Sequence, residues 1–289
     1  MIGNINSNSI YLSPLLKEIP AYQKLVKELL MVFDKCQLKI EWLEGTKDIW
    51  ARDYMPVKVA EGRYVSFLYE PWYLKGFETS RTNRYELPIL EQLKVTYSDI
   101  NLDGGNIELS DRFAIVTDRI YHENSNMSKK ALKAALEKLL ERELIVIKAY
   151  SKSEDMTGHI DGMLRLVDEN TIITSALIGD YQYHKKDMNR LKQAYGFEII
   201  EMPFFEDPYN KNKKVRLDDR ISAKGIYVNY LEIGEVILFP VFEMEGFKQY
   251  DKEAIATITN AYPNYTIVPI VINEIAEKGG LMNCISWTK

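Results

Sequence analysis

Residues 113–149 read FAIVTDRIYHENSNMSKKALKAALEKLLERELIVIKA and place a helical segment between two short apolar runs. The runs FAIVT at 113–117 and ELIVIKA at 143–149 are rich in branched side chains, which is typical of buried strands. Ser128 can cap a helix over 129–142, a segment made mainly of Ala, Leu, Lys and Glu. This stretch therefore predicts a strand–helix–strand unit of an α/β protein.

Similar units recur on both sides of this stretch. Before it we expect a helix over 21–35, with Leu25, Leu29, Val32 and Phe33 on one stripe, then a strand near 38–42 and β-like runs within 56–69. After it we expect strands near 163–167, 171–176, 197–201, 226–232, 235–240 and 264–271, with helices near 186–195 and 251–262. No linker rich in Pro, Gly or Ser divides the chain, so we predict a single domain over 1–289 built from strand–strand–helix–strand units.

Composition excludes several classes of protein. The 289 residues are 46% hydrophobic and 27% charged with a net charge of −5, so neither disorder nor nucleic-acid binding is expected. The basic residues Lys211, Lys213, Lys214 and Arg216 fall in an irregular stretch, 203–222, which we interpret as an exposed loop. No apolar run approaches the about 18 residues that span a bilayer, and the N-terminus resembles no secretory signal. Two cysteines and three isolated histidines predict no disulfide framework and no metal site, so we expect a cytoplasmic, reduced protein.

Polar residues concentrate in four segments: WARDYMP at 50–56, DGGN at 103–106, DMTGHIDG at 155–162 and GGLMNC at 279–284. If a strand begins at His159, His159 and Asp161 point to the same face and place a proton carrier beside a carboxylate. Gly158 and Gly162 would let backbone and ligand approach closely. The alternative is a buried structural histidine with a surface aspartate.

Cys284 is the candidate nucleophile. A free cysteine is more often a small buried apolar residue, but Gly279 and Gly280 permit a tight turn just before this one. A nucleophilic thiolate usually needs a nearby cation or histidine, and His159 is the histidine in a suitable setting. Cys36 has no comparable context, and we expect it to be structural.

Trp50, Asp53 and Asp161 suggest a binding site for a planar cation. Paired carboxylates with an aromatic wall hold a guanidinium well. We expect Arg52 to be structural, through an ion pair with Asp53 or bonds to backbone, and Asp103 to organise the pocket rather than touch a ligand. The segment from Asp103 to Asn106 could also be a simple turn.

The four segments, together with SAKGIYVNY at 222–230, resemble the agmatine deiminase and Porphyromonas-type peptidylarginine deiminase family of the guanidine-modifying superfamily. The resemblance implies a five-bladed α/β propeller, or pentein, with the active site in its central hollow. It implies that Cys284 is the nucleophile, that His159 is the acid and base, and that Asp161 and Asp53 hold the guanidinium beside Trp50. Supporting roles fall to Asn229, Asp103, Gly104, Gly105, Asn106 and Gly280. The resemblance implies neither a metal nor an organic cofactor, and it implies a homodimer.

Two departures from the family pattern concern the substrate. Asn283 stands where the family usually has a histidine before the cysteine, and Ile107–Asp111 replace a Gly-rich stretch. Agmatine, giving N-carbamoylputrescine, is the first candidate substrate, and peptidyl or free arginine, giving citrulline, is the second. Amidino transfer to an amine is a rival reaction. A non-catalytic guanidinium-binding protein is the rival of another class, and Asn283 is its best support.

Overall fold

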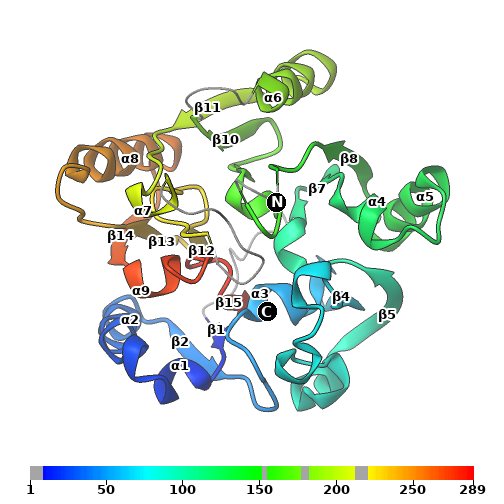
Figure 1. Cartoon of the computed structure of the whole chain (residues 1–289), viewed down its shortest axis with the longest axis horizontal. Coiled ribbons are helices and arrows are strands. Elements are labelled where there is room, and N and C mark those ends of the chain that lie inside the picture. Colours follow the sequence, from blue (N-terminus) through cyan, green and yellow to red (C-terminus); the bar gives the residue numbers. More distant parts are fainter. Residues whose placement is uncertain (1–8, 152–154, 177–181, 212–220) are drawn as a thin grey trace.

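The computed structural model of the chain describes residues 9–151, 155–176, 182–211 and 221–289. The described strands form five sheets of three strands each. Figure 1 shows the five sheets around a common centre, with the longer helices at the periphery. These helices are α2 (Gln23–Lys35), α5 (Lys129–Leu140), α6 (Gln182–Tyr195) and α8 (Lys248–Ala261).

All five sheets follow one pairing rule. The central strand pairs antiparallel with one neighbour and parallel with the other. Across the first sheet the strands lie in the order β15 (Ser286–Thr288), β1 (Ser9–Leu12), β2 (Lys39–Trp42), and across the second in the order β3 (Val57–Ala60), β4 (Arg63–Leu68), β5 (Lys94–Asn101). The third sheet consists of β6 (Glu108–Leu109), β7 (Phe113–Thr117) and β8 (Glu143–Ile147), and the fourth of β9 (Leu164–Leu166), β10 (Thr171–Ser175) and β11 (Glu198–Met202). The fifth consists of β12 (Leu231–Ile233), β13 (Val236–Val241) and β14 (Thr266–Val271).

A parallel pair needs a crossover connection, usually a helix. An α-helix supplies it in four sheets, which confirms the predicted strand–strand–helix–strand unit there. The sheet of β3, β4 and β5 differs, because four 3₁₀ turns cross from β4 to β5: η3 (Trp72–Leu74), η4 (Glu78–Ser80), η5 (Arg84–Glu86) and η6 (Pro88–Gln92). This connection carries Tyr73, within η3.

Helix α5 forms for the reasons that the sequence indicates. The Ser128 hydroxyl accepts a hydrogen bond from the Ala131 N–H, which satisfies a donor of the first turn. Leu132, Leu136 and Leu140 recur every four residues and are all fully buried. The helix ends at Leu140 rather than at 142, because Glu141 adopts a left-handed conformation with φ of 56°.

The two ends of the described chain meet in one sheet. Strand β1 pairs antiparallel with β15, with Ile10 opposite Thr288, and parallel with β2. Neither β1 nor β15 is predicted from the sequence, since each is only three or four residues long. The ring of sheets is therefore closed by the segment that directly follows Cys284.

Two predicted strands are wrong in detail. The strand predicted near 163–167 is present as β9, but it does not extend back to His159, because residues Ile160–Gly162 make the 3₁₀ turn η8 and β9 begins at Leu164. The strand expected over 226–232 is limited to β12, and residues 222–230 reach it through turns. The other predicted helices and strands are present, with ends shifted by a few residues.

The expected loop at 203–222 is only partly described. It contains the short helix α7 (Pro208–Lys211), and residues 212–220, with most of the basic run, lie outside the described residues. Across the ranges that are described, no helix has both the length and the apolar character needed to cross a membrane.

Candidate active site

Four of the five segments line one central hollow, and DGGN reaches it through the contacts of Asp103 with His159 and of Gly105 with Asp53. Among its lining residues are Trp50, Asp53, Tyr73, His159, Asp161, Asn229, Gly280 and Cys284. Each of the five segments runs into the first strand of a different three-stranded unit, namely β3, β6, β9, β12 or β15. The repeated unit thus brings residues from all five sheets to the same place, although they are far apart in the sequence.

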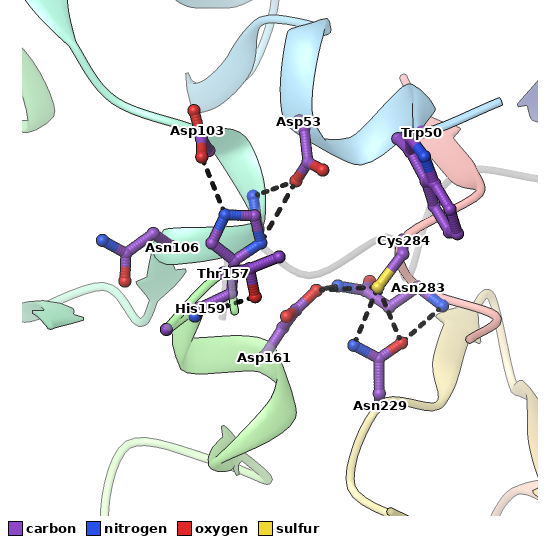
Figure 2. A network of polar contacts seen from close by, with 12 residues as sticks. Trp50, Asp53, Asp103, Asn106, Thr157, His159, Asp161, Asn229, Asn283 and Cys284 are labelled. Carbon is purple, nitrogen blue, oxygen red and sulfur yellow. Dashed lines mark hydrogen bonds and ion pairs between the residues drawn. The ribbon is translucent and has the colours of Figure 1, made fainter. Parts of the chain in front are cut away.

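His159 lies between two carboxylates on one side of the hollow (Figure 2). Its Nε2 is 2.8 Å from Asp103 Oδ2, and its Nδ1 is 3.5 Å from Asp53 Oδ1. All three side chains are buried. Burial alone would lower the pKa of His159, but the charges of Asp53 and Asp103 and the hydrogen bond to Asp103 raise it to about 10. His159 is therefore an imidazolium near neutral pH.

Glycine at position 105 makes this arrangement possible. The Gly105 N–H donates to Asp53 Oδ1 over 3.1 Å. A Cβ at Gly105 would lie 2.6 Å from both Asp53 Oδ1 and His159 Nδ1, which no side chain can do without displacing them. Gly104 is equally constrained, since a Cβ there would lie 2.0 Å from the carbonyl oxygen of Arg52. The DGGN segment is thus more than a simple turn.

Asn106 supports His159 indirectly, through Thr117 and Gly158. Its Oδ1 accepts a hydrogen bond from the Thr117 N–H at 3.1 Å, and the Thr117 hydroxyl donates to the Gly158 carbonyl at 2.8 Å. This chain of contacts fixes the backbone directly before His159. Asp103 contacts the hollow indirectly, through its hydrogen bond with His159.

Tyr73 is a pocket residue that the sequence analysis missed. Its hydroxyl donates to Asp103 Oδ2 over 2.9 Å and lies 3.4 Å from His159 Nε2. It belongs to η3, in a connection without a recognisable motif, so only the cluster of aromatic residues at 69–73 could have drawn attention to it.

Cys284 occupies the other side of the hollow. The Asn229 side-chain amide donates to its Sγ at 3.2 Å, and the thiol lies 3.7 Å from Asp161 Oδ2 (Figure 2). Burial, followed by the charges of Asp161 and Asp53, raises the pKa of the Cys284 thiol well above its ordinary value. His159 directs its described polar contacts at Asp53, Asp103 and Tyr73 rather than at the thiol. In the free protein the thiol is therefore neutral, contrary to the lowered pKa that a nucleophile needs.

Trp50 forms one wall beside Cys284. A Cβ at Gly280 would lie 2.2 Å from the Trp50 ring, so glycine lets the indole pack directly on the backbone. His159 and Asp161, although not on one strand, both line the same hollow. His159 reaches it from extended backbone and Asp161 from η8.

Arg52 points away from Asp53. Its side chain donates to Asn283 Oδ1 at 2.8 Å, and its backbone N–H donates to the Cys284 carbonyl at 3.1 Å. Within the described part of the chain, no group of three or more His, Cys, Asp or Glu side chains has the geometry of a metal site.

A family model described as Porphyromonas-type peptidyl-arginine deiminase matches residues 16–289. The chain belongs to this family. Among relatives of this deiminase-family chain is a Photobacterium profundum protein assigned to the agmatine deiminases, which is 24% identical over 286 residues, covering 84% of this chain and 75% of that protein.

Solved structures of agmatine deiminases share the fold. The Campylobacter jejuni agmatine deiminase has a TM-score of 0.75 and 19% identity, covering all of this chain and 95% of the other. An amidinotransferase of Microseira wollei has a TM-score of 0.60 and 12% identity, covering 97% of this chain and 93% of the other. At these identities the likeness establishes a common fold, and the chemistry has to be argued from the site.

The site of this deiminase-family chain favours a cation. The carboxyl groups of Asp53 and Asp161 line the hollow, and those of Asp53 and Asp103 lie beside the His159 imidazolium. The Cys284 thiol and the His159 imidazolium lie on opposite sides of the same hollow. Such a site can hold a planar cation between them and supply both a nucleophile and an acid.

Proposed function

We propose that the protein deiminates a small guanidino compound through a covalent intermediate on Cys284. The observation that carries this proposal is the meeting of Cys284, the carboxylates of Asp53 and Asp161, and the buried His159 imidazolium in one hollow. A further part of the proposal is that the five sheets are the blades of a five-bladed α/β propeller, a pentein, forming one catalytic domain over 1–289. A cytoplasmic location and a homodimer remain predictions.

The positive charge of the bound substrate changes the pKa of the Cys284 thiol. Asp53 and Asp161 hold the nitrogens of the guanidinium, and Trp50 packs alongside. The bound cation offsets the negative charges that raise the pKa of the Cys284 thiol, so the thiolate forms when the substrate is present. Asn229, which donates to the sulfur, stabilises that thiolate.

The reaction then takes two steps. The Cys284 thiolate forms an S–C bond to the guanidinium carbon, and the His159 imidazolium gives its proton to a nitrogen, which leaves as ammonia with the electrons of the broken C–N bond. Water next gives a proton to His159 and attacks the same carbon. The C–S bond breaks and restores the thiolate, the hydroxyl group on the carbon gives its proton to solvent as the C=O bond forms, and a neutral ureido product leaves. The sulfur thus divides one difficult hydrolysis into two easier steps.

Agmatine is the first candidate substrate, and N-carbamoylputrescine is its product. The similarity to agmatine deiminases supports it. So does the lining of the hollow, in which Leu74, Ile226 and Leu281 offer apolar contact to a methylene chain. Asp155 also lines the hollow, and since Thr157 bonds to its Oδ1, the second oxygen is available to a distal ammonium.

Lys278 supports a second candidate, an arginine with a free carboxylate. It lines the same hollow and its side chain is exposed. An ammonium at this place would attract the carboxylate of free arginine or of a C-terminal arginine, and citrulline would be the product. Agmatine has no carboxylate, so the two candidates make opposite demands on Lys278.

The test is ammonia release with agmatine, free arginine and a C-terminal-arginine peptide in parallel. We expect ammonia release from at least one of them. In Cys284→Ala the rate of release should fall at least a thousandfold, while substrate affinity measured by calorimetry should be nearly unchanged.

Lys278→Met should slow turnover of the arginine substrates and leave turnover of agmatine unchanged. Binding without ammonia release would contradict deimination and favour a binding protein. A new product on adding an amine would indicate amidino transfer.

A further inference from the structure

The side chain of Asn283 bridges two charged groups. Its Nδ2 donates to Asp161 Oδ2 over 2.8 Å, and its Oδ1 accepts from Arg52 Nη2 over 2.8 Å. The orientation of this amide is unambiguous, because a carboxylate can only accept and a guanidinium can only donate. The backbone N–H of Asn283 donates to Asn229 Oδ1 at 3.1 Å, and the residue is 3% exposed. Asn283 is therefore held rigidly.

Arg52 is a cation without an acidic partner at contact distance. Among the described residues, its guanidinium has one hydrogen-bond partner, Asn283, and its Nε is buried without any. Burial, and then the charge of Arg165, lower the pKa of Arg52, and Asp161 is the strongest of the negative charges that oppose this shift. The residue is half-buried, and a cation partly shielded from water in this position is strongly attracted to a carboxylate. The carboxylate beyond the Asn283 amide is Asp161.

The side chain of Arg52 carries the same chemical group as the proposed substrate. A direct pair between Arg52 and Asp161 would occupy the oxygens that the substrate guanidinium needs. It would also remove a negative charge from the site that has to attract a cation. Arg52 can therefore compete with the substrate guanidinium for the Asp161 carboxylate, from which the Asn283 amide separates it.

We propose that Asn283 is a positioning residue that turns Asp161 toward the hollow and keeps Arg52 from pairing with it. This inference rests on the proposed function, because it assigns Asp161 to substrate binding. A neutral amide suits the task, since it offers a donor to the carboxylate and an acceptor to the guanidinium at the same time. A neutral histidine, which has one N–H and one bare ring nitrogen, can satisfy the same two partners.

The experiment compares agmatine affinity in four proteins that all carry Cys284→Ala, so that no turnover is required. We expect Asn283→Leu to weaken agmatine binding on the order of tenfold, because Arg52 can then pair with Asp161 and compete with agmatine, and a single interaction with a charged group has an effect of about this size. Asn283→Leu with Arg52→Gln should recover most of that loss, because the competing guanidinium is gone. Asn283→His should bind agmatine nearly as well as the parent protein.

The recovery in the double variant distinguishes positioning from general damage. If Asn283→Leu only disturbed packing, adding Arg52→Gln would leave affinity equally low or lower, and the inference would be wrong. Unchanged affinity in Asn283→Leu would overturn it as well. If the leucine variant fails to fold by circular dichroism, Asn283→Ser with and without Arg52→Gln repeats the comparison with a smaller polar side chain.

Turnover in the same variants with Cys284 restored separates this inference from the proposed function. Asn283→Leu should raise KM for agmatine more than it lowers kcat, and Asn283→His should rescue KM. If agmatine binding follows the expected pattern but the wild-type protein releases no ammonia, deimination is contradicted and the role of Asn283 stands. If ammonia release is normal and KM is equal in all variants, the role of Asn283 is contradicted and deimination stands.

Discussion

At the scale of single residues, the sulfur of Cys284 has two neighbours with opposite effects. The Asn229 amide donates to it and stabilises a thiolate, whereas the Asp161 carboxylate disfavours one. Burial adds to the effect of Asp161 and raises the pKa of the thiol. The thiol is consequently protonated in the free protein. In the mechanism that we propose it stays protonated until a cation enters the hollow, which limits its reaction with other electrophiles.

Alkylation of Cys284 by iodoacetamide should therefore depend on pH and on ligand. In a Cys36→Ser protein, the rate should rise with pH through a midpoint above the about 8.5 of an ordinary thiol, because the raised pKa keeps the thiol protonated at lower pH. Guanidinium ion at low millimolar concentration should shift this midpoint downward. Mass spectrometry of the labelled peptide gives the rate at each pH.

Potassium ion at equal ionic strength is the control for the guanidinium arm. A midpoint below that of ordinary thiols in the free protein would contradict the neutral resting thiol. If guanidinium leaves the midpoint unchanged, a bound cation does not activate Cys284.

The principal candidates of the site could be predicted from single residues. Cys284, His159, Asp161, Asp53 and Trp50 line the hollow, and each stands in a polar segment that the surrounding strands do not require. Asn229 lines the hollow too, but only the resemblance to the family pointed to it. Their mutual contacts could not be predicted, since the pairing of His159 with Asp103, 56 residues away, exists only once the sheets are assembled. Tyr73 was missed because it stands in a connection whose sequence carries no motif.

At the scale of elements, strands and helices were predictable and the short turns that hold the site were not. Apolar runs and one-sided stripes identify β7, β8, β10 and α5, whose burial follows from the same patterns. The 3₁₀ turns η7 (Gly104–Asn106) and η8 are only three residues long, too short for any periodicity. Their shape depends on contacts with neighbouring units, so the expected strand at His159 was wrong.

Turn η7 gives a test at this scale. Gly105→Ala should lower kcat/KM for agmatine on the order of a hundredfold, because a Cβ 2.6 Å from both Asp53 Oδ1 and His159 Nδ1 must displace the pair, and misplacement by about 1 Å has effects of that size. Steady-state ammonia release measures kcat/KM, and thermal unfolding measures stability in the same preparation.

Gly62→Ala is the matched control for the change in η7. Gly62 has φ of +65° in the turn between β3 and β4, and a Cβ there would meet no atom within 4 Å. Its substitution should lower the unfolding temperature through backbone strain and leave kcat/KM unchanged. Equal losses of activity in the two variants would mean that Gly105 acts through stability rather than through the catalytic pair.

At the scale of the whole molecule, the site exists because the ring of sheets is closed. Asn283 contacts Asp161 across 122 residues of sequence, and Arg52 contacts Asn283 across 231. The closing strands β1 and β15 carry too few residues to be recognised from the sequence, although the resemblance to a known family implied that the chain forms a ring. Figure 1 places both strands close to the centre, next to the segments that line the hollow.

Trp287 is the side chain that ties β15 to the segment carrying Asp53. Its indole N–H donates to the Pro56 carbonyl at 2.7 Å, and its ring packs against Tyr11 and Tyr64 with centroids 5.0 and 5.8 Å away. The residue is 2% exposed. Trp287→Ala should therefore lower the free energy of unfolding by about 3–5 kcal/mol, as expected for a large side chain removed from a core. Urea unfolding followed by circular dichroism measures this, since tryptophan fluorescence itself would change.

The same substitution should affect catalysis, because Cys284 lies directly before β15 and receives its alignment from that strand. We expect kcat per folded molecule to fall, and saturating agmatine to restore part of the lost stability, since a ligand that binds the closed ring opposes its opening. Phe77→Ala is the control, because Phe77 is 56% exposed and should change neither property by much. A Trp287→Ala protein that is strongly destabilised yet keeps the wild-type kcat would show that the nucleophile is positioned by its local turn and by Asn229, independently of ring closure.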